Sequence, residues 1–440
     1  MSNRHVSRRS FLIGAAMAAS GCATTGGQRL AAAVAAGPRR SISPNEKINI
    51  AGIGIGGQGR SDLESCETHN IVALCDVDWK YAARTFNKYP DAKKYKDFRV
   101  MLDRQKDIDA VVIATPDNTH AVAAMAAIQC GKHVYCEKPL TFCIEEARKL
   151  ADAARAVKIA TQMGNSGQAS EESRLTCDYI WSGALGPVRE VHVWTNRPIW
   201  PQGVRRPEEA DAVPDTLDWD LWLGPAPERQ FNKAYLPFTW RGWRDFGTGA
   251  LGDMGCHAFH PIFRALKLGH PLSIEACSSD KERINPETFP LAEIVRYQFP
   301  ARGDMPPLML TWYDGGLFPA KPAEIESDDP LEEGGTLYIG DSGKMLGHLI
   351  IPEARRKELG RPPKMIERSP GHFEEWFSAC KGGEPAGANF DIASVVTQAT
   401  LLGNIAQKTR KRLLWDGEKI TNVGDANKYL GREYRAGWEI

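Results

Sequence analysis

The sequence has no net charge, no internal repeat and no Cys-x-x-Cys pair. Its 440 residues carry 55 basic and 55 acidic side chains. The charge balance therefore gives no sign of a nucleic-acid surface or of a charged surface that binds membranes. Apolar residues make up 42% of the chain and charged residues 25%. This composition is typical of an enzyme with two or three domains and an ample core.

The first 45 residues are typical of a targeting signal and a linker. Ser7–Leu12 reads S-R-R-S-F-L, a twin-arginine pattern, and the apolar run that follows at 13–19 is too short to span a bilayer. We therefore expect export by the twin-arginine route, to the periplasm or beyond. The end of the signal stays open. Ala19–Cys22 (A-S-G-C) is similar to a lipoprotein box that would place a lipid on Cys22, whereas residues 33–36 offer a cleavage site.

The ten cysteines do not form a disulfide pattern. The nine that follow the targeting signal are scattered through helical and strand patterns. A protein exported by the twin-arginine route folds first in the reducing cytoplasm, where disulfides are rare. We therefore expect buried free thiols.

Lys47–Gly59 (K-I-N-I-A-G-I-G-I-G-G-Q-G) has the pattern of an anion site. Ile48–Ile53 has the length of a buried strand, and glycines follow it. A strand, a glycine turn and a helix together let the backbone approach a pyrophosphate at the helix N-terminus. Two registers fit G-x-G-x-x-G, and we favour the one that keeps Ile53 in the strand and starts the helix near Arg60. The glycines predicted to bind the cofactor are Gly54, Gly56, Gly57 and Gly59.

A second strand at Ile71–Cys75 ends in Asp76, about 20 residues after the glycines. A dinucleotide-binding fold places a carboxylate there for the hydroxyls of the adenosine ribose. A carboxylate repels a ribose phosphate, so we expect NAD rather than NADP. The alternative is that Asp76 is a turn residue or a helix cap.

Strands and helices keep alternating up to residue 165, which predicts a doubly wound parallel sheet and a Rossmann domain over 46–165. Ligands of such sheets bind at the carboxyl ends of the strands. The amides of Gln162 and Asn165 could bond the nicotinamide carboxamide or a substrate hydroxyl there, or simply form a polar turn. The site residues predicted from the strand ends are Thr115, Pro116, His120, Glu137, Lys138, Gln162 and Asn165.

Three motifs, taken in this order, give the chain from Lys47 onward a resemblance to the Gfo/Idh/MocA oxidoreductase family. They are the glycine turn, A-T-P-x-x-x-H at Ala114–His120 and C-E-K-P at Cys136–Pro139. The resemblance implies a sugar or inositol dehydrogenase, with Lys138 near the nicotinamide and the substrate hydroxyl. It also implies a homodimer or homotetramer, and often a cis peptide bond before the motif proline.

Gly249–His260 (G-A-L-G-D-M-G-C-H-A-F-H) has the pattern of a chemical centre. Asp253 and His257 are four residues apart and share one face of a helix. A histidine can take a hydroxyl proton as hydride leaves the adjacent carbon, and a carboxylate beside it can orient it. The spacing matches the family's second catalytic motif, so we predict Lys138, Asp253 and His257 as catalytic residues, with His257 as the base. His260 is either a substrate contact or a structural histidine. The spacing would also allow a metal, which the family does not use for the hydride step.

The segment 197–243 is rich in proline and tryptophan and has little periodicity. Its length suits a loop that covers a substrate. Tryptophan faces stack on pyranose rings, so we predict substrate contacts at Trp200 and Trp240. The alternative is that these rings fill the core or a subunit contact.

Residues 166–440 are predicted to form an α+β domain that binds substrate and mediates oligomerisation. Several alternating strands in a row favour a large open, mainly antiparallel sheet, whose uncovered face suits a subunit contact. The segment 413–440 is expected to pack back on the domain or on a neighbour.

Free NAD is not expected outside the cytoplasm, so an exported dinucleotide enzyme should hold its cofactor tightly. Our first hypothesis is an NAD-dependent oxidoreductase that converts a ring hydroxyl of a sugar or glycoside to a ketone. The second is a glycoside hydrolase that works through oxidation, elimination, hydration and re-reduction. The third is a sugar-binding protein without catalysis.

Overall fold

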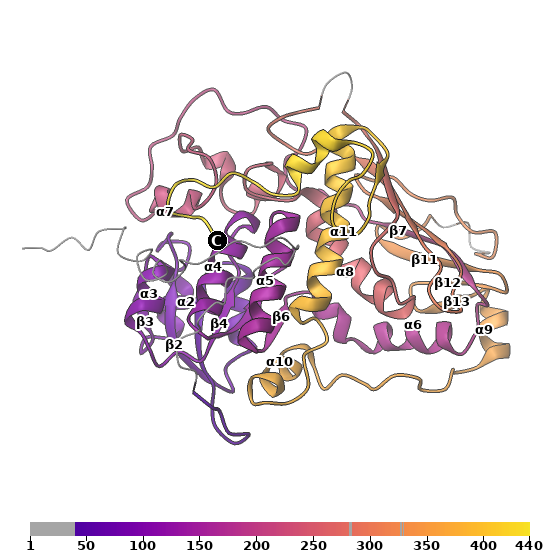
Figure 1. Cartoon of the computed structure of the whole chain (residues 1–440), viewed down its shortest axis with the longest axis horizontal. Coiled ribbons are helices and arrows are strands. Elements are labelled where there is room, and N and C mark those ends of the chain that lie inside the picture. Colours follow the sequence, from indigo (N-terminus) through magenta and orange to yellow (C-terminus); the bar gives the residue numbers. More distant parts are fainter. Residues whose placement is uncertain (1–39, 281–283, 326–327, 329) are drawn as a thin grey trace, which may run out of the picture.

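The computed structural model describes residues 40–280, 284–325, 328 and 330–440. The twin-arginine pattern and Cys22 lie outside the described residues. Two sheets organise the rest of the chain (Figure 1), one in each predicted domain. This confirms the fold class expected from the sequence.

The first sheet is parallel throughout, with the strand order β3-β2-β1-β4-β5-β6. β4 and β5 are buried along their whole length, which explains the apolar sequence Ala-Val-Val-Ile of β4 and the mainly apolar sequence of β5. β3 was not expected, because its Lys-Lys-Tyr sequence lies at the sheet edge and has no apolar run. The strands are β1 Asn49–Ile53, β2 Asn70–Cys75, β3 Lys93–Tyr95, β4 Ala110–Ile113, β5 His133–Cys136 and β6 Thr161–Met163.

Five helices connect these strands. The alanine-rich α4 is buried on all sides, and small side chains allow this close packing. In α5, the Glu146 carboxylate accepts from the backbone N–H of Cys143 and caps the first turn. The helices are α1 Gln58–Glu64, α2 Ala83–Lys88, α3 Phe98–Arg104, α4 Asp117–Gln129 and α5 Ile144–Val157.

The second sheet has the order β13-β12-β11-β7-β10-β9-β8-β14. Only the pair β7–β10 is parallel among the pairings of the described strands. β12 and β13 form a hairpin, because Gly347 turns the chain between them with φ +59°. The strands are β7 Val188–Trp194, β8 Ser273–Ser278, β9 Glu293–Phe299, β10 Leu308–Tyr313, β11 Gly335–Gly340, β12 Lys344–Leu346, β13 Leu349–Ile351 and β14 Leu413–Leu414.

Two long helices, α8 (Gly249–Ala265) and α11 (Phe390–Thr409), pack against each other between the two sheets (Figure 1). α11 contacts β8 and β9 on one side and α5 and β6 on the other. It therefore ties the domains into one body. The remaining α-helices of the second domain are α6 Glu171–Trp181, α7 Trp219–Leu223, α9 Glu353–Leu359 and α10 His372–Cys380.

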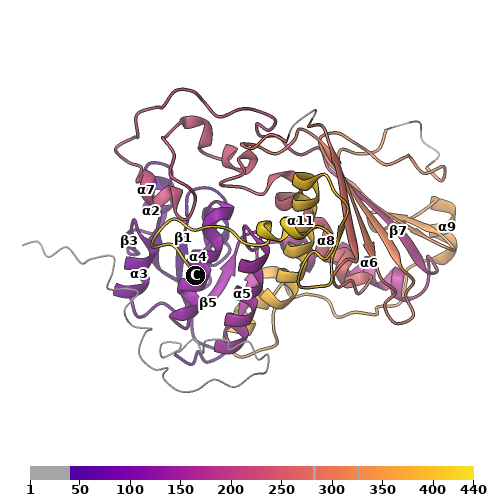
Figure 2. The same ribbon diagram turned by 45° about the horizontal axis from the view of Figure 1, so that its top comes forward.

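The segment 197–243 lies over the Rossmann domain (Figure 2) and has its own small core. This core includes Trp222, Phe231 and Trp243. The backbone of Trp79 donates to the carbonyl of Thr216 at 3.1 Å, which joins the segment to the first domain. The segment thus covers the edge at which β2 ends.

The last residues, 431–440, form a segment that we call the C-terminal tail. It leaves the second domain and lies on the Rossmann domain, as both views show (Figures 1 and 2). The sequence predicted that this end of the chain packs on the second domain or on a neighbour, but the last residues lie on the first domain, where Arg432 pairs with Glu146 of α5.

The described cysteines are all free thiols, as expected, although Cys277 is exposed and Cys130 is only partly buried. Among the described residues, no helix has both the length and the apolar character to cross a membrane.

Candidate active site

The glycine turn after β1 has the form expected of a phosphate-binding turn. Gly54 has φ +76°, and a Cβ built on it would lie 2.8 Å from the backbone carbonyl of Ala114. Only glycine allows this conformation and this contact with the end of β4. A Cβ on Gly59 would meet the oxygen of Gly54 at 2.1 Å, so the helix packs directly on the turn. α1 begins at Gln58, two residues before the expected start, and its N-cap is Gly57, which has no side chain.

Asp76 lies at the end of β2 beside this turn. Its Oδ2 accepts from the backbone N–H of Ile55 at 2.8 Å, and its Oδ1 accepts from that of Asp78 at 2.9 Å. Burial raises the pKa of Asp76 to about 6, although the two backbone hydrogen bonds oppose the shift. A carboxylate has about four acceptor positions, so Asp76 can still accept from ribose hydroxyls.

One cavity of about 360 Å³ lies between the carboxyl ends of the Rossmann strands and the segment 197–243. It contains most of the residues predicted to bind the cofactor. Because the glycine turn and the Asp76 carboxylate both line it, the cavity fits the pyrophosphate and the ribose of NAD. The predicted residues that line it are Gly54, Gly56, Gly57, Asp76, Thr115, Pro116, His120, Glu137, Lys138 and Trp240.

Lys138 lies at the far end of this cavity in a cluster of charges. Its Nζ donates to Oδ1 of Asp253 at 2.7 Å, and Nε of Arg241 donates to the same oxygen at 3.1 Å. Asp253 comes from α8 and Arg241 from the segment 197–243. One carboxylate thus joins three separate parts of the chain. The peptide bond from Lys138 to Pro139 is cis, as the resemblance implied.

The cluster keeps Lys138 protonated. Burial alone lowers the pKa of the amine, but the carboxylates of Asp253 and Glu137 outweigh burial, and the pKa is raised. Burial likewise raises the pKa of Asp253, but Lys138 and Arg241 reverse this effect, and the pKa is lowered. Lys138 is therefore a charged donor at neutral pH.

His257 lies one turn after Asp253 on α8 and is partly buried. Burial lowers its pKa to about 4, and the positive charge of Lys138 contributes. The imidazole is therefore neutral at pH 7 and can accept a proton. Of the three predicted catalytic residues, only Lys138 lines the cavity. Asp253 contacts Lys138, and His257 is near enough for the charges of both to act on its pKa.

His120 links the ends of two strands. Its Nδ1 lies 2.7 Å from the carbonyl of Pro139, and its Nε2 lies 2.9 Å from that of Thr115. Burial lowers the pKa of His120 to about 4 even though both carbonyls favour the charged ring. The neutral ring can donate to only one of the two carbonyls, and only the protonated ring could donate to both.

Glu137, beside Lys138, faces a second buried carboxyl group. Burial raises the pKa of Glu137 well above its usual range, and the nearby Asp62 on α1 adds to the shift. Burial also raises the pKa of Asp62, to about 7. A Cβ built on Gly164 would lie 2.0 Å from Oε1 of Glu137, so a side chain at that position would displace the carboxyl group.

Gln162, Asn165 and His260 lie behind the cavity and do not line it. Nδ2 of Asn165 lies 2.7 Å from Nδ1 of His260, and Nε2 of Gln162 donates to the carbonyl of His372 at 3.0 Å. The Oε1 of Gln162 accepts from the backbone of Ala388 at 2.9 Å. These side chains connect β6 with α8, α10 and the segment before α11, so their contacts with a ligand stay predictions.

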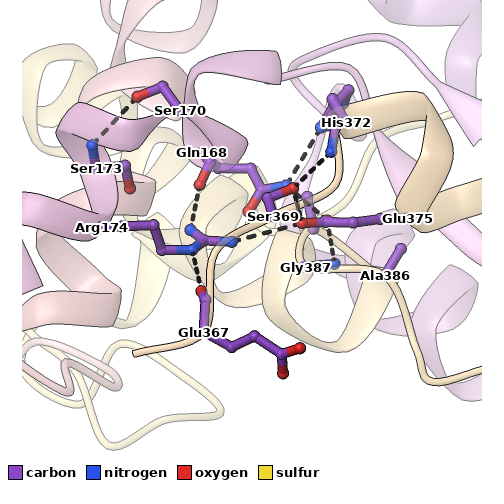
Figure 3. A network of polar contacts seen from close by, with 12 residues as sticks. Gln168, Ser170, Ser173, Arg174, Glu367, Ser369, His372, Glu375, Ala386 and Gly387 are labelled. Carbon is purple, nitrogen blue, oxygen red and sulfur yellow. Dashed lines mark hydrogen bonds and ion pairs between the residues drawn. The ribbon is translucent and has the colours of Figure 1, made fainter. Parts of the chain in front are cut away.

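The network continues through Arg174 of α6 (Figure 3), where Gln168, His372 and Glu375 point toward one another. Nη1 of Arg174 donates to the carbonyl of Gln168 at 2.6 Å, and Nε2 of Gln168 donates to Glu375 at 3.0 Å. Arg264 donates to Oε1 of Gln168 at 2.5 Å and lies 3.2 Å from His260. Both ring nitrogens of His260 thus face nitrogen donors, and the neutral ring can accept from only one of them.

The two tryptophans predicted to contact substrate differ in position. Trp240 lines the cavity, and the guanidinium of Arg241 lies 4.3 Å from its ring centre. Trp200 is buried, donates to Gln202 at 2.9 Å and packs edge-on against Phe238. Trp200 therefore supports the segment, whereas Trp240 faces the ligand space.

The sequence analysis missed several residues of the cavity wall. Arg241 had no signal, because it lies in a segment without periodicity, 12 residues before Asp253. Tyr81 lies against Gly56 and Gly57, and only its place in the loop after Asp76 could have drawn attention to it. The residues that line the cavity and that we did not predict include Tyr81, Phe98, Trp222, Phe238, Arg241 and Trp438. No group of His, Cys, Asp or Glu in the described part of the chain could hold a metal ion.

Two family models match the chain. The model described as "Oxidoreductase family, NAD-binding Rossmann fold" matches residues 48–165, and the model described as "Oxidoreductase family, C-terminal alpha/beta domain" matches residues 193–287. Both are models of the Gfo/Idh/MocA oxidoreductases. The two matches include the glycine turn, Lys138 and the Asp253–His257 pair.

Curated relatives include a levoglucosan dehydrogenase of Pseudarthrobacter phenanthrenivorans, 31% identical over 185 residues. An alpha-N-acetylgalactosaminidase of Shewanella oneidensis is 30% identical over 203 residues. These alignments cover 42% and 41% of this chain and 39% and 44% of the relatives. The match therefore spans less than half the length of either relative.

Among solved structures, myo-inositol dehydrogenase from Lactobacillus casei in complex with NAD(H) and myo-inositol is similar, with a TM-score of 0.56. The comparison covers 84% of this chain and 97% of that chain at 15% identity, which shows a shared fold. Residues 48–165 and 193–287 therefore match the two domains of Gfo/Idh/MocA oxidoreductases, and the first domain of this chain is an NAD-binding Rossmann domain.

Proposed function

We propose that the protein is an oxidoreductase that uses tightly held NAD to oxidise a ring hydroxyl of a sugar or glycoside to a ketone. One observation carries the proposal. The cavity that begins at the glycine turn and Asp76 ends at Lys138, which Asp253 and Arg241 hold as a cation. NAD, when bound, supplies the hydride acceptor.

The roles of the three predicted catalytic residues follow from their charges. The Lys138 ammonium donates to the substrate oxygen and stabilises the negative charge that develops there. The neutral imidazole of His257 takes the hydroxyl proton as the C–H hydrogen leaves with its electron pair. Asp253 fixes the direction of the Lys138 amine and can accept from a neighbouring hydroxyl.

A carbohydrate is the substrate class that the relatives favour. The levoglucosan dehydrogenase and the alpha-N-acetylgalactosaminidase are both named for carbohydrates. In this chain, the indole of Trp240 and the guanidinium of Arg241 form an aromatic and cationic wall next to Lys138. Such a wall can contact both the C–H face and the hydroxyls of a pyranose ring.

Export is the second part of the proposal. Ser7–Leu12 supports the twin-arginine route, and a lipid on Cys22 would add a membrane anchor. The cofactor would then have to travel inside the folded protein. In its host, a tagged chain should appear in the exported fraction, and replacing Arg8 and Arg9 by lysine should keep it in the cytoplasm. If the wild type and the variant were distributed equally between the cytoplasm and the exported fraction, this result would contradict export by the twin-arginine route.

The relative from Shewanella oneidensis favours a second candidate function. It is named as a glycosidase, and its identity to this chain, 30%, is close to the 31% of the levoglucosan dehydrogenase. In this alternative, the ring carbon is oxidised and the adjacent C–H becomes acidic. The glycosidic oxygen then leaves, water adds, and the ketone is reduced again. The net reaction is hydrolysis, with no net consumption of NAD.

The test begins with protein purified without added cofactor and then denatured. Near-stoichiometric NAD(H) in the supernatant supports tight binding. A panel of sugars and nitrophenyl glycosides then separates the outcomes in D₂O. Oxidation gives a keto-sugar and reduced cofactor, whereas the hydrolytic route releases nitrophenol and places deuterium next to the oxidised carbon. NAD-loaded protein that binds sugars but gives none of these products would instead be a binding protein.

The family resemblance also leads us to propose a homodimer or homotetramer. Helices α8 and α11 cover one face of the eight-stranded sheet, which leaves the other face for a subunit contact. Light scattering of the purified chain tests this, and a monomeric mass at micromolar concentration would contradict it.

A further inference from the structure

The C-terminal tail is fastened at several points to the Rossmann domain and to the segment over it. Arg432 pairs with Glu146 of α5 at 2.5 Å, and both side chains are almost fully buried. Arg435 donates to Oδ1 of Asp220 in α7 at 2.7 Å, and its Nε donates to the carbonyl of Gly224 at 2.9 Å. The tail therefore bridges both walls of the cofactor cavity.

The end of the tail places an indole ring in the cavity wall. Trp438 is buried, and it lines the same cavity as Gly54 and Asp76. The guanidinium of Arg99 lies 4.2 Å from the centre of the indole ring, and the ring of Phe98 packs against it at a centroid distance of 6.1 Å. Nη1 of Arg99 also approaches the carbonyl of Gly437, at 3.4 Å. The ring is thus held in one orientation.

The strand order assigns this wall to one half of the cavity. The sheet runs β3-β2-β1-β4-β5-β6, and the glycine turn follows the central strand β1. Lys138 follows β5, which is the side of the reacting carbon. Asp76 follows β2, and Phe98 follows β3 in the sequence, so Trp438 lies with them on the opposite side. This is the side where the adenosine of a dinucleotide lies when its ribose bonds Asp76.

From this placement we infer that the C-terminal tail is a clasp for the adenosine end of NAD, with Trp438 as the aromatic wall beside the adenine. The inference rests on the proposed function, because it assigns a device for cofactor retention. An aromatic ring that stacks on a purine stabilises the bound ligand without contacting any other part of it. Because the tail also holds the segment 197–243 through Arg435, it links closure over the substrate to retention of the cofactor.

The test uses the full chain stripped of cofactor and three separate probes: NAD, ADP-ribose and nicotinamide mononucleotide. Trp438→Ala should weaken the binding of NAD and of ADP-ribose by about tenfold each, as expected for one lost stacking contact. It should also speed NAD dissociation, measured by chase in a stopped-flow instrument. Binding of nicotinamide mononucleotide should not change. Trp438→Phe keeps a ring and should retain most of the affinity.

Glu433→Gln is the matched control, because Glu433 is an exposed residue of the same tail. It should bind all three probes like the wild type. If Trp438→Ala does not fold, Arg99→Ala replaces it and should weaken ADP-ribose in the same direction by a smaller factor. ADP-ribose affinity within twofold of the wild type, or an equal loss for nicotinamide mononucleotide, would overturn the clasp. A wild-type chain that binds none of the probes would instead overturn the proposed use of NAD.

Discussion

Replacing Asp253 with asparagine removes one charge from the cluster and keeps its shape. The amide oxygen can still accept from Lys138 and Arg241, but two buried cations then face a neutral group. In the native cluster, the side chains of Asp253 and Lys138 are only 9% and 13% exposed. Breaking a buried ion pair by removing one partner costs about 3 to 5 kcal/mol. We expect Asp253→Asn to lower the free energy of unfolding by about 3 kcal/mol, near the lower end of this range, because Lys138 can lose its proton.

This release of a proton gives the variant a distinct pH dependence. In the wild type the folded pKa of Lys138 is raised, so its contribution to stability is present at neutral pH and is lost as the pH rises through the folded pKa. In the variant, burial, which is the largest effect, and Arg241 both lower the pKa of Lys138, and only Glu137 still raises it. The contribution of Lys138 to the stability of the variant is then present at high pH, and it is lost as the pH falls through the lowered pKa. The difference in unfolding free energy between the two chains should therefore shrink from pH 7 to pH 10.

Urea unfolding followed by tryptophan fluorescence measures this difference at each pH. Asp341→Asn is the matched control, because Asp341 forms an exposed pair with Arg189 at 2.7 Å. Asp341→Asn should lower the free energy of unfolding much less than Asp253→Asn does, and this decrease should change little with pH. The variant should also lower kcat by about 10² or more, because Lys138 no longer keeps its proton and its position. A free-energy difference that stays constant from pH 7 to pH 10 would refute the coupling of Asp253 to Lys138.

Three further predictions concern the base, the ribose contact and the glycine turn. Because burial lowers the pKa of His257 to about 4, kcat at saturating NAD should stay level from about pH 8 to pH 5, and a decline centred near 6.5 would contradict a neutral buried base. NAD affinity measured by calorimetry should fall as the pH drops through about 6, the pKa to which burial raises Asp76, and Asp76→Asn should bind weakly at every pH. Gly54→Ala should lower the melting temperature and the NAD affinity more than Gly183→Ala, because both glycines have positive φ but only Gly54 touches Ala114. Equal effects of the two glycine substitutions would show that the contact is unimportant.

Local patterns predicted the parts of the site that depend on short stretches of sequence. The glycine turn, the strand ending in Asp76 and the Asp253–His257 pair on one helix all require residues within a few turns of one another. The strand order then placed Lys138 at the same edge as the glycine turn. For this reason the fold and the part of the cavity wall that follows the strand ends could be predicted.

The missed residues depend on contacts between distant segments. Arg241 reaches Asp253 from an irregular loop, and Trp438 reaches the cavity from the far end of the chain. Neither has a periodic neighbourhood that indicates its partner. Gln162 and Asn165 follow a strand end, as a ligand contact would, but the α10 region and α8 supply their partners. Only the packing of the second domain on the first decides between these alternatives.

Hydride transfer from a carbohydrate to the bound cofactor would show directly that the protein is a sugar oxidoreductase. NAD-loaded wild type and Lys138→Met should be mixed with a panel of sugars deuterated at their ring carbinols, and the recovered cofactor weighed by mass spectrometry. The account predicts deuterium in the cofactor of the wild type for at least one sugar and a rate at least about 10² lower in the variant. Transfer at an equal rate in both chains, or none from any sugar to a wild-type chain that retains NAD, would contradict it.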